Sequence, residues 1–295
     1  MGDLFIVGLA GFLASMVDGA LGMGFGPTSS SILLSQGFSP AATSTIVNLA
    51  KVATGLSAAA AHWRFRNIDR RLVLRLAIPG SLGALVGVTI LTNVDGNQLK
   101  PILAALLLLV AIRILARFSN LPSRPAGADE DSLPTYDERG TIPTAAVGGV
   151  TNGLVGAWGP VVTPFLLHKG LAPRFAIGSV NTAEVAVAVV ASGSLLGSVG
   201  GGGVDFGIVL AMIIGGVIAS PIAAWSIRFL PARGLGIAVG ALLLTTNTRE
   251  LANWGDLGRT RWFAYAAIAV VTTVAALRPR LAQRRQVDVV DPATA

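Results

Sequence analysis

Long apolar stretches follow one another along this chain and constrain its fold more than any other feature. Each is close to the roughly 20 residues that a helix needs to cross the ~30 Å hydrocarbon layer of a bilayer. Seven such stretches cover residues 40–63, 72–94, 98–118, 172–199, 206–230, 234–252 and 261–277. Only 13% of the residues are charged, against roughly 25% in a typical soluble domain. The sequence therefore predicts an all-α polytopic membrane protein with about seven spans.

Two further apolar stretches, residues 4–34 and 142–167, are interrupted near their middles. The interruptions read DGALGMGFGP and NGLVGAWGP. Glycine and proline at this density break a helix, because glycine loses backbone entropy and proline lacks a donor. Each stretch therefore either crosses the membrane once as a broken helix or returns to its starting side as a re-entrant hairpin.

The chain contains an internal duplication, because matching residues recur in the same order at a nearly constant spacing. Pro27, Pro40 and Asn48 are each followed 133 residues later by the same residue type, and Asp69, Gly80 and Arg113 are so matched 136 residues later. Proline, glycine and asparagine recurring in order are a stronger sign of a repeat than aligned leucines. We expect a first repeat at 1–118 and a second at 142–252. A polar cytoplasmic linker at 119–141 separates them, and an additional helix with a basic tail follows at 253–295.

The distribution of lysine and arginine chooses between the two arrangements of the interrupted stretches. Positive residues accumulate on the cytoplasmic side of a membrane. If the stretches are re-entrant hairpins, the repeats are inverted, and 17 basic residues lie inside against 4 outside. If the stretches cross once, the repeats are parallel and the division is 12 against 9. The sequence thus predicts two inverted repeats, each a hairpin plus three spans, with the N-terminus outside and the C-terminus cytoplasmic.

The chemistry of the chain excludes several classes of function. The net charge of +7 comes from basic residues placed singly or in short runs between apolar stretches, which does not predict a nucleic-acid surface. No cysteine is present, so disulfides and thiol chemistry are excluded. No Walker, HExxH or GxSxG motif occurs, so we expect neither an enzyme nor a metal or other cofactor.

The doubled pattern resembles the sulfite exporter TauE/SafE family over residues 4–251. The resemblance rests on GALGMGFGPTSSSILLSQGFSPAATSTIVNLAKVATG in the first half and GLVGAWGPVVTPFLLHKGLAPRFAIGSVNTAEVAVAVVASG in the second. It implies an inner-membrane protein of two related modules that exports sulfite, sulfoacetate or other small organosulfur anions. The second loop departs from the glycine-rich form because it contains Trp158 and is one residue shorter, so the two hairpins need not do the same work.

Two opposite charges lie near the middle of predicted spans. Lys51 is placed close to the bilayer centre, and its repeat mate Glu184 is at a comparable depth. A buried charge inside a membrane is costly and usually functional. Either the two form an ion pair that locks the repeats together, or Lys51 binds an anionic substrate while Glu184 exchanges a proton as the coupling-ion site.

Polar side chains extend this candidate site along the same helices. Asn48 and Asn181 precede the two charges by three residues, so they lie on nearly the same helix face. Their amides suit an oxyanion, and equally suit hydrogen bonds between helices. Thr45 and Ser179 extend the same polar strip.

The hairpin tips supply the remaining candidates. Backbone N–H groups at the start of a helix attract anions, and glycine allows close approach to a ligand. The alternative is tight helix packing through small residues. Asp18 is a candidate proton or cation site, or a cap of the half-helix that follows. The expected substrate-binding residues of the tips are Gly24, Gly26, Pro27 and Thr28 in the first and Gly156, Gly159, Pro160 and Thr163 in the second.

Together these features predict a secondary transporter that exports a small anion by alternating access, with coupling to protons. An anion channel is the nearest alternative, and a membrane scaffold without transport activity is another. The expected partners are the small anion and the lipid bilayer, with a homo-oligomer possible. Arg113, one turn inside its span, is expected to extend to the cytoplasmic headgroups.

Overall fold

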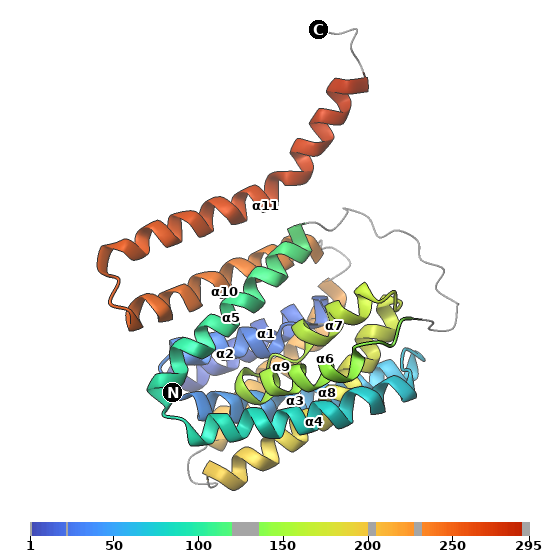
Figure 1. Cartoon of the computed structure of the whole chain (residues 1–295), viewed down its shortest axis with the longest axis vertical. Coiled ribbons are helices and arrows are strands. Elements are labelled where there is room, and N and C mark those ends of the chain that lie inside the picture. The colour runs from blue at the N-terminus through green and yellow to red at the C-terminus, as the bar shows by residue number, and fades with distance from the viewer. Residues whose placement is uncertain (1, 22, 120–135, 200–204, 227–231, 291–295) are drawn as a thin grey trace.

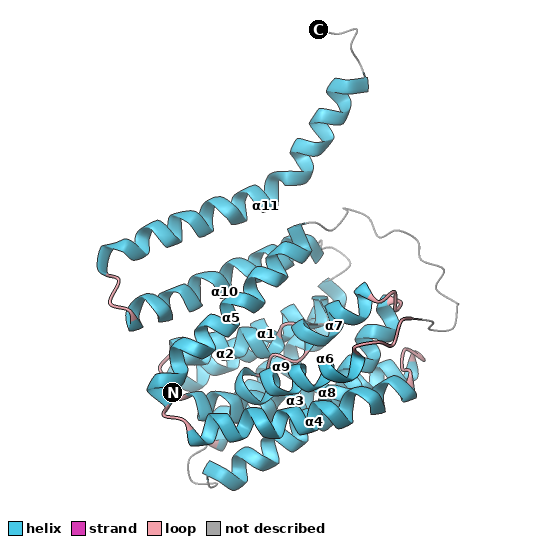
Figure 2. Cartoon of the chain, in the orientation of Figure 1, coloured by secondary structure: helices cyan, strands magenta, loops and turns pink. Residues whose placement is uncertain are grey.

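The computed structural model describes residues 2–21, 23–119, 136–199, 205–226 and 232–290. All regular structure in these ranges is helical (Figure 2). The first five helices are α1 (Gly2–Leu21), α2 (Phe25–Ser35), α3 (Pro40–Arg64), α4 (Arg70–Asn93) and α5 (Gly96–Ser119). The next are α6 (Thr141–Val155), α7 (Gly159–His168), α8 (Pro173–Val199), α9 (Phe206–Ser226), α10 (Ala232–Trp254) and α11 (Arg261–Val290), with a short 3-10 turn at Gly258–Thr260. Most of the predicted linker lies outside the described residues.

Helices occupy each of the seven predicted spans, and four of the described helical segments are long and apolar enough to cross a membrane. These segments are Arg70–Asn93, Gly96–Ser119, Arg174–Ser198 and Gly258–Leu277. Exposed apolar side chains such as Leu74 and Ile78 on α4 would face lipid. The helical class is confirmed, whereas the count of seven spans stays a prediction. The last helix, α11, extends beyond residue 277 to Val290 and lies outermost in Figure 1.

Both interrupted stretches are broken helices, as their glycines and prolines predict. The second break lies at residues 156–158, where Gly156 takes a φ of 69°. The first is shorter than the sequence suggests, because α1 continues through Asp18 to Leu21. Each glycine costs a helix only about 1 kcal/mol, so packing along α9 can keep the last turn of α1 helical. The chain leaves the helical conformation at Gly24, whose φ is 149°.

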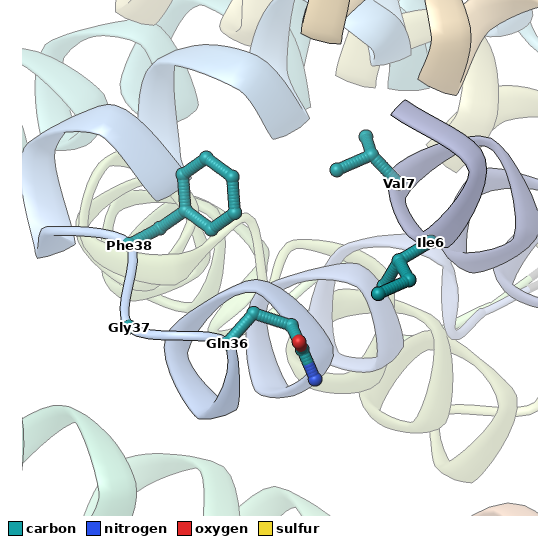
Figure 3. Close-up of a pocket in the computed structure, with 5 residues that line it drawn as sticks. All are labelled: Ile6, Val7, Gln36, Gly37 and Phe38. Carbon is teal, nitrogen blue, oxygen red and sulfur yellow. The ribbon is translucent and has the colours of Figure 1, made fainter. Parts of the chain in front are cut away.

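Each broken pair returns to the side on which it began. Ile6 and Val7 in α1 line one cavity of about 270 Å³ together with Gln36, Gly37 and Phe38 after α2 (Figure 3). A straight helix would separate residues 6 and 36 by about 45 Å at 1.5 Å per residue. At the other pair, the Asp137 N–H before α6 donates to the Lys169 carbonyl after α7 at 3.3 Å. We call α1–α2 the first hairpin and α6–α7 the second hairpin.

Small residues bring each hairpin into close contact with a long helix. A Cβ added at Gly11 of α1 would collide with the Met212 backbone of α9, and one added at Gly83 of α4 would collide with the Ala146 backbone of α6. Such contacts between backbones are a common basis of helix association in membranes. The other extensive contacts join α3 with α8, α4 with α8 and α5 with α10. This packing brings α3, α8 and both hairpin tips together.

Candidate functional site

Lys51 and Glu184 form an ion pair between α3 and α8. The Lys51 side chain is 4% exposed and that of Glu184 is 17% exposed. Besides Glu184 Oε1, the Lys51 ammonium donates to Asn152 Oδ1 at 3.1 Å and to the Gly156 carbonyl. An ammonium has three donors, and all three are engaged. In this conformation Lys51 binds an anion only by giving up one of these partners.

Asn48 belongs to the same network. Asn152 Nδ2 donates to Asn48 Oδ1 at 2.7 Å, and Asn48 Nδ2 donates to the Ser44 carbonyl at 2.9 Å and to the Asn152 carbonyl at 3.3 Å. Ser44 Oγ in turn donates to the Gly153 carbonyl at 2.7 Å. Sequence reasoning did not place Asn152 in the site. Asn152 lies 134 residues after Asp18, at the corresponding position of the second glycine-containing stretch, and this correspondence is the signal that could have found it.

The network is built on the C-terminal end of α6. The last carbonyls of a helix have no partner within it and carry a partial negative charge. Side chains of the first repeat supply the missing donors, since Ser30 Oγ donates to the Val155 carbonyl at 2.7 Å and Lys51 to Gly156. The positive charge of Lys51 is therefore stabilised by the end of α6 as well as by Glu184.

The two hairpin tips touch each other at glycines. A Cβ added at Gly26, in the first turn of α2, would collide with the Gly156 carbonyl. Trp158 explains how the second tip differs from the first. Its ring is fully buried, and Nε1 donates to the Val180 carbonyl of α8 at 3.1 Å. The second tip is thus anchored to α8 by a large side chain that also makes a hydrogen bond.

Asp18 caps α2 and also forms a charge cluster with Lys51 and Glu184. Its Oδ1 accepts from the Phe25 N–H at 3.3 Å, which is the capping arrangement that the sequence allowed. The half-buried Asp18 also lies within electrostatic reach of Glu184 and Lys51. If all three are ionised, one positive and two negative charges leave the cluster with a formal charge of −1.

Other predicted site residues lie apart from this network. Thr45 Oγ1 donates to the Ala41 carbonyl of its own helix at 2.8 Å, and Ser179 Oγ accepts from the Asp69 N–H at 3.0 Å, next to the start of α4. Asn181 is half-buried and makes no side-chain hydrogen bond to the residues that the structure describes. Of the strip predicted from helical spacing, only Asn48 therefore belongs to the network around Lys51.

The starts of α2 and α7 carry buried hydroxyls. Thr28 and Ser29 follow Pro27 in α2, and Thr163 follows Pro160 in α7. All three are fully buried, and none of their hydroxyls has a hydrogen-bond partner among the described residues. A buried polar group without a partner is costly, so these positions are suited to receive a polar ligand. Gly24 lies directly before α2, and Gly159 is the first residue of α7.

Ion pairs also secure the base of the second hairpin. Lys169 Nζ donates to Asp137 Oδ2 at 2.7 Å, and this hydrogen bond holds the pKa of Asp137 below its usual value. Arg75, near the start of α4, pairs with Glu138. The base of the second hairpin therefore lies beside the start of α4, which follows the loop at residues 65–69.

Comparisons with known proteins agree with the resemblance seen in the sequence. The description "Sulfite exporter TauE/SafE" belongs to the family that matches residues 7–249. The probable membrane transporter protein YtnM of Bacillus subtilis strain 168 is 37% identical over 270 residues, which cover 91% of this chain and 87% of YtnM. YdhB, a probable membrane transporter protein of the same organism, is 25% identical over 227 residues, or 75% of this chain and 89% of YdhB.

No solved structure shows significant similarity to this chain. The family match nevertheless covers most of the sequence, including both hairpins and the Lys51–Glu184 pair. YtnM matches over nearly the whole length of both chains. The chain therefore belongs to the sulfite exporter TauE/SafE family of membrane transporters.

Proposed function

We propose that this protein is a secondary transporter that exports a small anion, sulfite or an organosulfonate, across the inner membrane by alternating access. The family name and the transporter relatives support this class of function. The N-terminus lies outside and the C-terminus lies in the cytoplasm, which places the loop between α3 and α4, with the arginines that flank it, inside.

The two halves are inverted repeats. The helix contacts between the two halves occur in matching pairs. The helix α1 of the first half packs along α9 of the second half, and the corresponding helix α6 of the second half packs along α4 of the first half. The paired glycines Gly37 and Gly170 have φ values of 91° and 92°. The base of the first hairpin adjoins the start of α3, whereas the base of the second hairpin adjoins the loop that follows the end of α3. The hairpins therefore enter from opposite sides, which is the arrangement expected around a central transport site.

The observation that carries the proposal is the saturated ammonium of Lys51 between the repeats. Lys51 belongs to the first repeat, and its partners Glu184, Asn152 and Gly156 belong to the second. A small oxyanion that reaches Lys51 replaces Glu184 as its partner. The released carboxylate, in a poorly hydrated site, then takes up a proton because an isolated buried charge is costly. This exchange of partners couples anion binding to proton binding.

The decisive experiment is flux in proteoliposomes that contain the purified full-length chain. Radiolabelled sulfite is supplied at equal concentration on both sides, and a pH step is imposed across the membrane. Accumulation of sulfite against its gradient, together with proton movement reported by a pH dye, supports a coupled carrier. Flux that only runs down the sulfite gradient identifies a channel, and absence of flux with sulfite, sulfoacetate and taurine removes the proposal.

A further inference from the structure

A cavity of about 340 Å³ lies where α5 passes both hairpins. Arg113 and Arg117 of α5 line it on one side. Met23 from the tip of the first hairpin and Pro160 and Pro164 from α7 line it on the other. We call it the α5 cavity. A second cavity of about 320 Å³ adjoins Arg113 and the first turn of α6.

Both guanidinium groups are available to a ligand. Arg113 is exposed and Arg117 is half-buried, and neither has an ion-pair partner in the part of the chain that the structure describes. Their spacing of four residues places them on one helix face. A guanidinium offers five donors in a planar fork that suits oxyanions and binds them strongly. Two such groups beside one cavity form a receptor for a small anion of one or two charges.

The depth of the α5 cavity argues against simple anchoring in the membrane interface. An arginine that only reaches the headgroups needs no cavity behind it, yet this cavity extends to Met23, whose side chain is 2% exposed. On the α7 side it extends to Pro160 and Pro164, and between them lies Thr163 with its buried, unpartnered hydroxyl. An anion held by the two arginines is thus already beside both hairpin tips.

We propose that Arg113 and Arg117 form a second anion site, on the cytoplasmic side, where a small oxyanion such as sulfite binds before it reaches Lys51. The side and the order of binding rest on the transport function proposed above. The anion site itself rests only on the arginines and the α5 cavity. The two parts can therefore be tested separately.

The first test measures anion binding without transport. The purified full-length chain in detergent is treated with phenylglyoxal, which modifies arginine, with and without sulfate, and the modified residues are quantified by mass spectrometry. Sulfate is expected to slow modification of Arg113 and Arg117 at least threefold, while Arg249, the repeat mate of Arg113 on α10, is unaffected. Absence of protection by sulfate overturns the site, as does protection by phosphatidylglycerol alone, which would assign the arginines to lipid headgroups.

The second test measures the order of binding by sided sulfite flux in proteoliposomes. The double variant Arg113→Gln, Arg117→Gln is expected to raise KM about tenfold for sulfite supplied at the cytoplasmic face, because a charge-assisted contact is lost. The KM from the opposite face stays within twofold, and kcat from that face falls as the cytoplasmic KM rises, because a variant must change kcat/KM equally in both directions. Arg113→Lys with Arg117→Lys restores part of the affinity, and Arg249→Gln leaves the cytoplasmic KM unchanged. An equal rise in KM at both faces, or no change in KM, overturns the proposal.

The two proposals fail in different ways. If sulfate protects the arginines but the wild-type chain moves no sulfite, sulfoacetate or taurine, the anion site stands and the transport function fails. If the wild-type chain transports sulfite but neither protection nor a sided change in KM is found, the transport function stands and the second site fails.

Discussion

Replacing Lys51 by Met tests the centre of the site, because Met has a similar length and no charge. The substitution leaves Glu184, 17% exposed, without its partner. Removing one member of a buried ion pair costs about 3–5 kcal/mol. The Gly156 carbonyl and Asn152 Oδ1 also lose a donor, and a buried acceptor left without a donor adds to the cost. The free energy of unfolding is therefore expected to fall by about 3–5 kcal/mol.

A double variant separates the electrostatic part from the rest. Lys51→Met with Glu184→Leu removes both charges, and replacing a buried pair by apolar groups is often close to neutral. We expect this variant to regain about half of the lost stability, since Asn152 and Gly156 still lack a donor. Because it folds better than the single variant, its loss of sulfite flux can be assigned to the site and not to unfolding.

Thermal unfolding in detergent, followed by tryptophan fluorescence, measures these differences. A loss of this size corresponds to a lowering of Tm on the order of 10 °C. Lys100→Met, on α5 and without an ion pair among the described residues, is the matched control and is expected to keep the wild-type Tm. A Lys51→Met variant with both wild-type Tm and wild-type flux would refute the reasoning, because Lys51 would then neither join the repeats nor serve transport.

Three further predictions follow from contacts elsewhere in the fold. Gly26→Ala forces a Cβ into the Gly156 carbonyl and should lower the free energy of unfolding by about 1–3 kcal/mol. Gly193 has open space around it, so the control variant Gly193→Ala should keep the wild-type stability. Equal Tm values for the two variants would contradict this prediction. Trp158→Phe removes the hydrogen bond to Val180 and should cost about 1–3 kcal/mol in chemical denaturation, so unchanged stability would count against an anchoring role. The pKa of Asp137 is lowered in the folded chain, so its hydrogen bond to Lys169 stabilises the fold at every pH above the ordinary Asp pKa of about 3.9. This stabilisation is lost only as the pH falls through the lower pKa of the folded state. The Tm difference between Asp137→Asn and wild type should therefore stay constant from pH 8 to 5, and its disappearance near pH 6 would exclude this hydrogen bond as the cause.

The helices and their breaks follow from local properties of the sequence, so they could be predicted. Gly24 precedes α2 and Gly156 follows α6, and at both positions the chain adopts positive φ, which glycine tolerates best. The partners of Lys51 could be predicted only in part. Glu184 follows from the repeat, but the Gly156 carbonyl carries no side-chain signal, and its approach to Lys51 depends on how the second hairpin packs.

Residues on one predicted helix face can also have different environments, which periodicity does not reveal. Asn48 lies in the charge network, whereas its repeat mate Asn181 makes no side-chain hydrogen bond to the described residues. The second tip, with Trp158 and Asn152, differs from the first tip and so breaks the equivalence of the repeats. The place of Arg113 beside a cavity could not be predicted either, because it depends on α7, a neighbour distant in sequence.

The contact between Gly26 and Gly156 has a consequence for the speed of transport. A barrier made of side chains can open by rotamer changes within picoseconds to nanoseconds, but two touching backbones separate only when a whole hairpin moves, on a scale of microseconds to milliseconds. In the transport cycle proposed here, each passage of an anion therefore waits for a displacement of helices. Turnover should accordingly be that of a carrier, orders of magnitude below the conduction rate of an open pore.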